Sequence, residues 1–317
     1  MSASEPLVSI LINNYNYGRF LREAIDSALN QTYRNTEVIV VDDGSTDNSR
    51  EIIASYGDRI IPVLKDNGGQ ASAFNAGFRV SKGDLICYLD SDDSWLSTKV
   101  ERVVEIALSH PQAVFIYHRI QPAAAGLRPI RKALPTSLLQ GNVSARVMGA
   151  GGWWACPPTS ALCLRRRVLE RIGPLPEGEL RTNADAFLQY VVTFLGPVLG
   201  FGEVLTLYRR HGANATGAAE FGEQAPGRRA LIAHLQGYEH LVSAANTHLD
   251  KLQVGVRLRM EDHWSYQFLK YRTGLPGHYS CLRLALLALC FAGLPSVTDR
   301  AKAAARAILQ RPLPEGS

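Results

Sequence analysis

The sequence predicts an α/β protein with a doubly wound, mostly parallel sheet, helices on both faces and a helical extension at the C-terminal end. Apolar runs of strand length alternate with helical patterns over the first 120 residues, which is typical of parallel strands joined by crossover helices. Acidic clusters follow two of these strands directly, and beyond residue 227 the pattern is helical almost to the end. We therefore expect an α/β domain over residues 1–222 and a helical C-terminal extension over 223–317.

Each predicted element rests on the period of its apolar residues. The strands are short runs of apolar and β-branched residues at Leu7–Ile12, Glu37–Val41, Ile60–Leu64, Leu85–Leu89, Thr159–Leu164 and Val204–Arg209. Apolar residues at helical spacing predict helices at Phe20–Leu29, Ser49–Ser55, Ala71–Val80, Val100–Leu108 and Asn183–Phe194. Residues 121–136 are rich in Ala, Pro, Gly and Arg without a clear period, which predicts a loop or flexible lid. Breaks in the helical extension are expected at Gly274–Gly277 and near Pro295.

The composition and charge of the chain exclude several classes of protein. A formal net charge of +5 over 317 residues suits anionic ligands but is too weak to indicate nucleic-acid binding. The five cysteines show no C-x-x-C spacing, which argues against a disulfide framework or a zinc site. The N-terminus shows no basic segment followed by an apolar one, as a signal peptide would. We therefore expect a cytoplasmic protein with reduced cysteines.

The helical extension contains an apolar run at Leu284–Leu294, about half as long as a membrane-spanning helix requires. Basic residues flank this run at Arg283, Arg300, Lys302, Arg306 and Arg311. Two interpretations stay open. The run forms a core helix, or the C-terminal helices make peripheral contact with the inner face of an anionic membrane.

Three carboxylates end the strand predicted at Leu85–Leu89, in the sequence Asp90-Ser91-Asp92-Asp93. Like charges at this spacing repel, and their burial is costly unless a cation compensates them. Hard cations such as Mg²⁺ and Mn²⁺ take carboxylate and phosphate oxygens as ligands. The pattern indicates a metal and phosphate site at the carboxyl end of a strand, although the same residue types also form turns and helix caps.

Two further motifs accompany the acidic cluster. Asp42-Asp43-Gly44-Ser45-Thr46-Asp47 follows the second predicted strand, where Gly44 permits a tight backbone and a carboxylate can accept an N–H from a nucleobase. Asn67-Gly68-Gly69-Gln70 opens the next helix, where glycines let the backbone approach a ligand and the helix N-terminus favours anions. Ligands of doubly wound sheets bind beyond the carboxyl ends of the strands, so we expect these motifs to share one pocket.

In this order the motifs resemble those of the family 2 glycosyltransferases, which have the GT-A fold. The resemblance is carried by residues 8–17, 41–47, 67–77 and 83–93. It implies a nucleotide-sugar donor and a divalent cation, Mn²⁺ or Mg²⁺, held on the donor diphosphate. Asp42 and Asp43 become nucleoside contacts, Asp92 the direct metal ligand and Asp90 a support for the sugar-diphosphate side. Further donor contacts are implied at Asn14, Tyr15, Asn67, Gln70, Asn75 and Ser91.

The acceptor hydroxyl is a poor nucleophile and needs a base within hydrogen-bond reach. Family members carry this base as the Asp of a Glu-Asp pair at a helix start, and the matching place here reads Asn183-Ala184-Asp185. The resemblance therefore implies Asp185 as the general base, although Ala184 replaces the Glu of the pair. Glu177 and Glu179 are the fallback candidates.

Two later segments resemble the acceptor side and the end of the family's catalytic domain. Trp153 and Trp154 precede a Pro-Pro-Thr-Ser sequence, and because Trp faces stack on sugar rings they are candidates to line the acceptor groove, or else to anchor a loop in the core. The sequence Tyr208-Arg-Arg-His211 implies that His211 contacts the diphosphate and serves as a metal ligand.

The sequence thus predicts a metal-dependent, inverting glycosyltransferase that moves a sugar from a nucleotide-diphosphate donor to a hydroxyl of a glycan or lipid-linked acceptor in polysaccharide assembly. Inversion follows from the resemblance. Two alternatives stay open. A sugar-phosphate nucleotidyltransferase would carry a Gly-rich, Arg-bearing signature after the first strand, where the chain reads Asn13-Asn-Tyr-Asn-Tyr-Gly18. A degenerate member would bind nucleotide-sugars and transfer nothing.

Overall fold

The computed structural model describes residues 5–152, 154, 157–211, 228–290, 297–310 and 312–313. The chain forms two compact units, one of residues 1–142 and 156–211, the other of residues 143–155 and 212–317. The domain boundary expected at 222/223 lies outside the described residues. No pattern in the sequence had indicated that residues 143–155 group with the helical unit.

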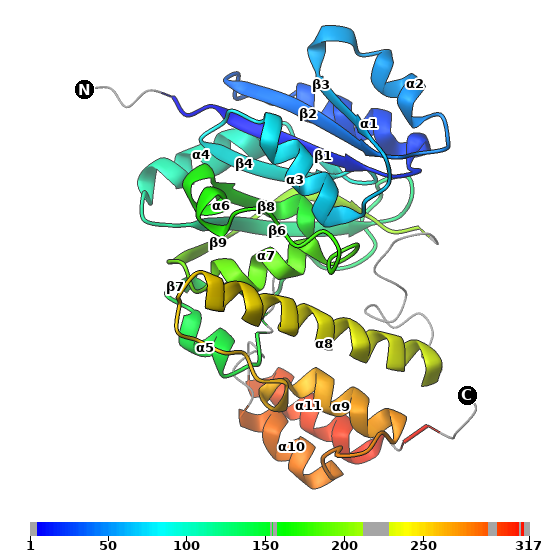
Figure 1. Ribbon diagram of the computed structural model, residues 1–317, viewed down its shortest axis with the longest axis vertical. Helices are drawn as coiled ribbons and strands as arrows, with labels where there is room; N and C mark the ends of the chain where they lie inside the picture. Colours follow the sequence, from blue (N-terminus) through cyan, green and yellow to red (C-terminus); the bar gives the residue numbers. More distant parts are fainter. Residues whose placement is uncertain are drawn as a thin grey trace. The chain divides into compact units, whose positions relative to one another are not determined.

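The first unit is built on one mixed sheet (Figure 1). Its strands, in order across the sheet, are β3 (Ile61–Lys65), β2 (Thr36–Asp43), β1 (Val8–Asn14), β4 (Leu85–Asp90), β8 (Leu162–Arg165), β6 (Phe115–Ala123), β9 (Val198–Arg209) and β5 (Ser94–Trp95), and β7 (Gln140–Gly141) pairs with β9. Strands β3, β2, β1 and β4 are parallel, and β8 is antiparallel to both β4 and β6. The parallel half therefore presents the carboxyl ends of β2, β1 and β4 at one edge.

Helices cover both faces of the sheet, so the predicted α/β class is confirmed (Figure 1). The helices of this unit are α1 (Gly18–Leu29), α2 (Ser49–Ala54), α3 (Gln70–Val80), α4 (Lys99–Ser109), α6 (Arg166–Ile172) and α7 (Ala184–Val192). On one face, Leu21 of α1 and Val103 of α4 share an apolar cluster with Ile10 of β1. On the other face, Gly77 of α3 packs against Leu11 of β1. Consecutive residues of β1 are thus buried on opposite faces, as parallel sheets require.

The loop or lid predicted over residues 121–136 is wrong in part. Strand β6 extends to Ala123, and the chain then folds back so that bridges join Ile120 to Leu134 and Ala123 to Pro129. Two backbone hydrogen bonds of 2.7 and 2.9 Å link Ile120 and Leu134. The composition hides this strand because its pairing partner, β9, lies far along the chain, and strand formation depends on such tertiary context.

Two other strand boundaries differ from the prediction. The strand expected to begin at Thr159 starts at Leu162, after a 3-10 turn over Thr159–Ala161. Strand β9 begins at Val198, well before the predicted Val204, and its register with β6 shifts around Arg119. These boundaries place a hydroxyl-bearing turn, and not a strand, against the end of β4.

The second unit is helical, as predicted for the C-terminal extension. Its helices are α5 (Ser144–Met148), α8 (Arg228–Lys251), α9 (Trp264–Thr273), α10 (Cys281–Cys290) and α11 (Val297–Leu309). Helix α9 ends at Gly274, whose φ of 67° is left-handed, so the predicted break there is confirmed, whereas Pro295 lies outside the described residues. Within the described ranges, every helix is too short or too polar to cross a bilayer.

We expect Gly77→Val to destabilise the first unit. A Cβ at Gly77 would lie 3.0 Å from Leu11 Cδ2 and 3.1 Å from Val41 Cγ2, so a larger side chain must push α3 away from the sheet. Overpacking of this kind costs about 1–3 kcal/mol of unfolding free energy. Urea denaturation measures the loss. Gly178→Val is the control, because a Cβ there meets no atom within 4 Å, and equal losses in both variants would contradict the packing described.

Candidate active site

Three carboxylates gather at the carboxyl end of β4. Asp90 is the last residue of the strand, and the chain turns so that the Asp93 N–H donates to the Asp90 carbonyl at 3.1 Å. One oxygen from each of Asp90, Asp92 and Asp93 falls within 4.8 Å of the others, close enough to hold one metal ion. The predicted acidic cluster is therefore a spatial cluster and not an exposed turn.

Burial and mutual repulsion make this cluster electrostatically costly. Burial raises the pKa of Asp90 well above its usual range, and the nearby Asp92 and Asp185 carboxylates raise it further. Burial also raises the pKa of Asp93 well above its usual range, again reinforced by Asp92 and Asp90. Carboxyl groups with raised pKa values bind a cation in exchange for protons. The arrangement favours positive charge in the middle of the cluster.

Asp93 is held in place by neighbours from other strands. Its Oδ2 accepts from Ser160 Oγ at 2.6 Å, and its Oδ1 accepts from the Arg209 N–H at 2.8 Å. Ser160 Oγ also accepts from the Asp90 N–H at 3.0 Å. The Ser160 hydroxyl therefore contacts both ends of the acidic turn and holds Asp93 in place.

The Arg209 side chain supplies part of the compensating charge. It is 3% exposed, its Nε donates to the Asp92 carbonyl at 2.6 Å, and its guanidinium forms an ion pair with Glu23 of α1. The guanidinium also lies 4.5 Å from the ring centroid of Phe20. Through Arg209, the acidic turn is therefore joined to Glu23 of α1.

His211 completes one side of the cluster. Its Nε2 lies 3.0 Å from Asp92 Oδ2, which is close enough for both atoms to bind one cation, and its ring packs 4.8 Å from Phe20 and 5.4 Å from Tyr17. Burial raises the pKa of Tyr17 to about 12, with further contributions from Asp92 and Asp90. The carboxylate oxygens of the cluster are the ligand type that Mn²⁺ and Mg²⁺ prefer, and His211 contacts one of them.

Asp185 reaches the same cluster from α7. Thr159 Oγ1 donates to Asp185 Oδ2 at 3.1 Å, and the charge of Asp185 acts on Asp90. Burial raises the pKa of Asp185, although hydrogen bonds from Ala186 N–H and Thr159 oppose the shift. Distant segments thus bring the predicted base beside the predicted metal motif.

The Gly-rich motif positions the start of α7. Gly69 has a φ of +86°, and a Cβ on it would lie 2.5 Å from Arg181 Cα. Gln70 N–H donates to the Arg181 carbonyl at 2.9 Å, and Gln70 Oε1 accepts from the Ala184 N–H at 2.8 Å. Because Gly69 has no side chain, the backbone at Arg181, which leads to Asp185, can pass close to it. Asn67 contacts the same segment, because its Oδ1 accepts a hydrogen bond from the Arg181 guanidinium.

Asp42 and Asp43 end β2 with protein partners on their carboxylates. Burial would raise the pKa of Asp42, but hydrogen bonds from Ser45, Arg50 and Asn14 outweigh it and hold this pKa below its ordinary value. Asp43 accepts from the Lys65 ammonium at 2.6 Å and from the Gly68 and Gly69 N–H groups at 2.9 and 2.7 Å. Both carboxylates organise their loops, and their role as nucleoside contacts stays a prediction.

Among the residues that the structure describes, several buried polar atoms beside the cluster have no hydrogen-bond partner. They are both side-chain polar atoms of Asn13, Oδ1 of Asn14 and Oγ of Ser91. Asn13 lies opposite Asp90 in the β1–β4 pairing. Buried groups of this kind normally find a partner, so this edge of the sheet offers hydrogen bonds to a polar ligand.

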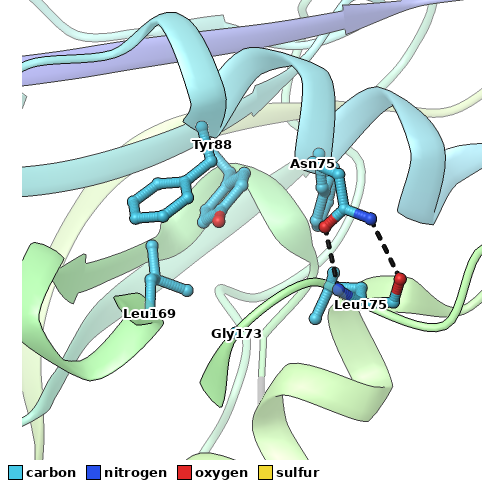
Figure 2. Close-up of a pocket in the computed structure, with 7 residues that line it drawn as sticks. Asn75, Tyr88, Leu169, Gly173 and Leu175 are labelled. Carbon is cyan, nitrogen blue, oxygen red and sulfur yellow. Dashed lines mark hydrogen bonds between the residues drawn. The ribbon is translucent and has the colours of Figure 1, made fainter. Parts of the chain in front are cut away.

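Other predicted contacts lie elsewhere or stay untested. Asn75 uses both ends of its amide on the Leu175 backbone, with two hydrogen bonds of 2.9 Å, and lines a small pocket with Tyr88 (Figure 2). Tyr15 is 47% exposed. Trp153 lies outside the described residues. Trp154 is buried within the second unit.

Comparison with known proteins identifies the family. The family model described as Glycosyl transferase family 2 matches residues 9–173, which is more than half of the chain. The chain belongs to glycosyltransferase family 2. It is 35% identical over 271 residues to an uncharacterized glycosyltransferase of Nostoc sp., a match that covers 83% of this chain and 82% of that protein.

A more local similarity joins this glycosyltransferase to an Escherichia coli protein, the UDP-Glc:alpha-D-GlcNAc-diphosphoundecaprenol beta-1,3-glucosyltransferase WfaP. The identity is 42% over 100 residues, which cover 31% of this chain and 40% of WfaP.

Solved structures with the same fold include TarS of S. aureus in complex with UDP (TM-score 0.54, 14% identity, covering 95% of this chain and 91% of TarS). The mannosyltransferase PcManGT from Pyrobaculum calidifontis, in complex with GDP-Man and Mn²⁺, also matches, with TM-score 0.54, 16% identity and coverage of 97% of this chain and 81% of that chain. At these identities the likeness shows the fold, which confirms GT-A architecture.

Sequence reasoning missed four residues that shape the site of this glycosyltransferase. Thr159 and Ser160 are predicted as the start of one strand, Arg209 as the end of another, and Tyr17 only as part of a motif. Their side chains meet the acidic cluster through tertiary contacts. The available signal was chemical, since buried carboxylates need donors and a hydroxyl-bearing turn before a strand can supply them.

We expect Ser160→Ala to destabilise the acidic turn, because Asp93 Oδ2 loses its 2.6 Å donor and the Asp90 N–H loses its acceptor. Leaving such buried groups unpaired costs about 1–3 kcal/mol. Thermal or urea unfolding measures the change. The exposed Ser97→Ala is the control, and a Ser160→Ala protein as stable as this control would show that the two hydrogen bonds contribute nothing.

Proposed function

We propose that this family 2 glycosyltransferase is an inverting, metal-dependent enzyme that transfers a sugar from a nucleotide-diphosphate donor to an acceptor hydroxyl. The observation that carries the proposal is the convergence of Asp185 with the Asp90–Asp93 cluster at one edge of the sheet. A base beside carboxylates that could hold a cation would serve both halves of the displacement, the deprotonation of the acceptor and the departure of the diphosphate.

Asp92 and His211 are the residues that would hold a divalent cation, with Asp90 beside them. When bound, the cation would neutralise the charge that develops on the departing diphosphate. The three clustered carboxylates and the 3.0 Å contact between Asp92 Oδ2 and His211 Nε2 support this assignment. Mn²⁺ and Mg²⁺ both suit the carboxylate oxygens.

Asp185 acts as the general base. The acceptor oxygen bonds to the anomeric carbon while the bond from that carbon to the diphosphate oxygen breaks, and the hydroxyl proton passes to the Asp185 carboxylate. Burial raises the pKa of Asp185, which strengthens it as a proton acceptor. Thr159 orients the carboxylate through its hydrogen bond of 3.1 Å. Single displacement inverts the anomeric configuration.

The donor binds along the carboxyl ends of β2, β1 and β4. The unpartnered polar atoms of Asn13, Asn14 and Ser91 provide hydrogen bonds there, and Asp42 and Asp43 shape the nucleoside end. The local similarity to WfaP supports UDP-glucose as the first donor to test and a lipid-linked sugar diphosphate as the acceptor. Membership of a glycosyltransferase family argues against the sugar-phosphate nucleotidyltransferase weighed as an alternative.

Asp185→Asn is expected to lower the transfer rate by a factor on the order of 10²–10⁴, the usual contribution of a general base, and to leave donor binding intact. Release of nucleoside diphosphate from a panel of UDP- and GDP-sugars with Mn²⁺ and candidate acceptors measures the rate. NMR of the product gives its anomeric configuration.

The exposed Asp58→Asn serves as the matched control for that experiment. Donor binding with no turnover by the wild type would favour the degenerate binding protein, which the replacement of Glu by Ala184 suggested. Equal rates in wild type and Asp185→Asn would rule out Asp185 as the base, and a product with retained configuration would rule out single displacement.

We expect Asp92→Asn to weaken Mn²⁺ binding at least tenfold, because the substitution removes one charged oxygen ligand from the site. Calorimetric titration of the protein with MnCl₂ measures this without reference to activity. The exposed Asp66→Asn is the control. Unchanged affinity in Asp92→Asn would place the cation elsewhere.

A further inference from the structure

Helix α10 exposes three of its five leucines. Its inner face contributes one leucine and two alanines, Leu284, Ala285 and Ala288, to a cluster with α9 and α11. Its outer face exposes Leu282, Leu286 and Leu289 by 68%, 64% and 46%. These three residues follow the spacing i, i+4, i+7 and so form one stripe. A helix whose only purpose was core packing would bury its leucines and expose its alanines.

Helix α11 packs beside α10 (Figure 1). It also buries alanines and exposes larger apolar residues, and it carries exposed basic residues. Its inner face is formed by Ala303, Ala304 and Ala307, while Ile308 and Leu309 are 55% and 79% exposed. Lys302 and Arg306 are also exposed and lie on the same side as Leu309, at helical spacing. In the part of the chain that the structure describes, neither has a carboxylate within ion-pair distance.

The charge of the whole protein is concentrated in this segment. Residues 281–311 contain five basic residues and one acidic residue, so they hold four of the five net positive charges. Exposed leucines beside lysine and arginine are the features of helices that lie in the plane of a membrane interface. A second copy of the chain would bring the same positive charge to the contact, whereas anionic phospholipids bring the opposite charge.

We propose that the outer faces of α10 and α11 bind the surface of an anionic phospholipid membrane. The leucine stripe enters the boundary between headgroups and acyl chains, and the basic residues contact the phosphate layer. This binding is independent of the catalytic chemistry, and it would bring the enzyme to the surface where a lipid-linked acceptor resides.

The test is co-sedimentation of the full chain with vesicles of phosphatidylcholine alone or of phosphatidylcholine and phosphatidylglycerol at 3:1. We expect the wild type to bind the anionic vesicles at least tenfold more strongly, and high salt to reduce that binding. Leu282→Ser/Leu286→Ser should reduce it tenfold or more. The control, Leu64→Ser/Leu108→Ser, changes two leucines that are each 53% exposed in the first unit and should bind as the wild type does.

A second variant, Lys302→Glu/Arg306→Glu, tests the charge without touching the leucines and keeps the test valid if the leucine variant fails to fold. The proposal would be overturned if the wild type did not bind anionic vesicles, or if both variants bound them as strongly as the wild type. Light scattering that shows a dimer lost in the leucine variant, without vesicle binding, would instead make this face an interface between copies. Nucleoside diphosphate release, measured on the same preparations, distinguishes failure of membrane binding from failure of the catalytic proposal.

Discussion

The site depends on how the protein holds several carboxylates together at the end of β4. Asp90, Asp92 and Asp93 repel one another and lie where water is largely excluded. Ser160 and Arg209 offset this cost with directed hydrogen bonds and one buried cation. Arg209 also pairs with Glu23 of α1, so the acidic turn is tied to that helix, and the three carboxylates stay close enough to hold one metal ion.

The topology of the sheet explains how these partners arrive. Strand β8 enters antiparallel beside β4, so the turn that precedes it places Thr159 and Ser160 against the acidic turn. Strand β9 ends at Arg209, which delivers both its backbone N–H and its guanidinium to the cluster. The parallel half of the sheet supplies the acidic turn after β4, and the mixed half supplies the groups that fix it.

The Gly-rich motif positions the start of α7, the helix that carries Asp185. Its glycines allow the backbone to pass close to Arg181, and Gln70 then holds the first N–H of α7. Asn183, at the start of this helix, takes a left-handed conformation, which asparagine tolerates better than most residues. Ala184, the first residue of the helix, is fully buried.

The sequence by itself determined the α/β class, the parallel strands and the acidic residues at their ends, because apolar period and turn chemistry act over a few residues. The resemblance carried by the motifs also led to Asp92, Asp185 and His211. Only the tertiary structure decided that Asp185 lies beside Asp90, that Ser160 and Arg209 secure Asp93, and that residues 121–123 belong to a strand. It also decided which leucines of α10 point outward. These outcomes depend on contacts between segments far apart in the chain, and no local pattern encodes them.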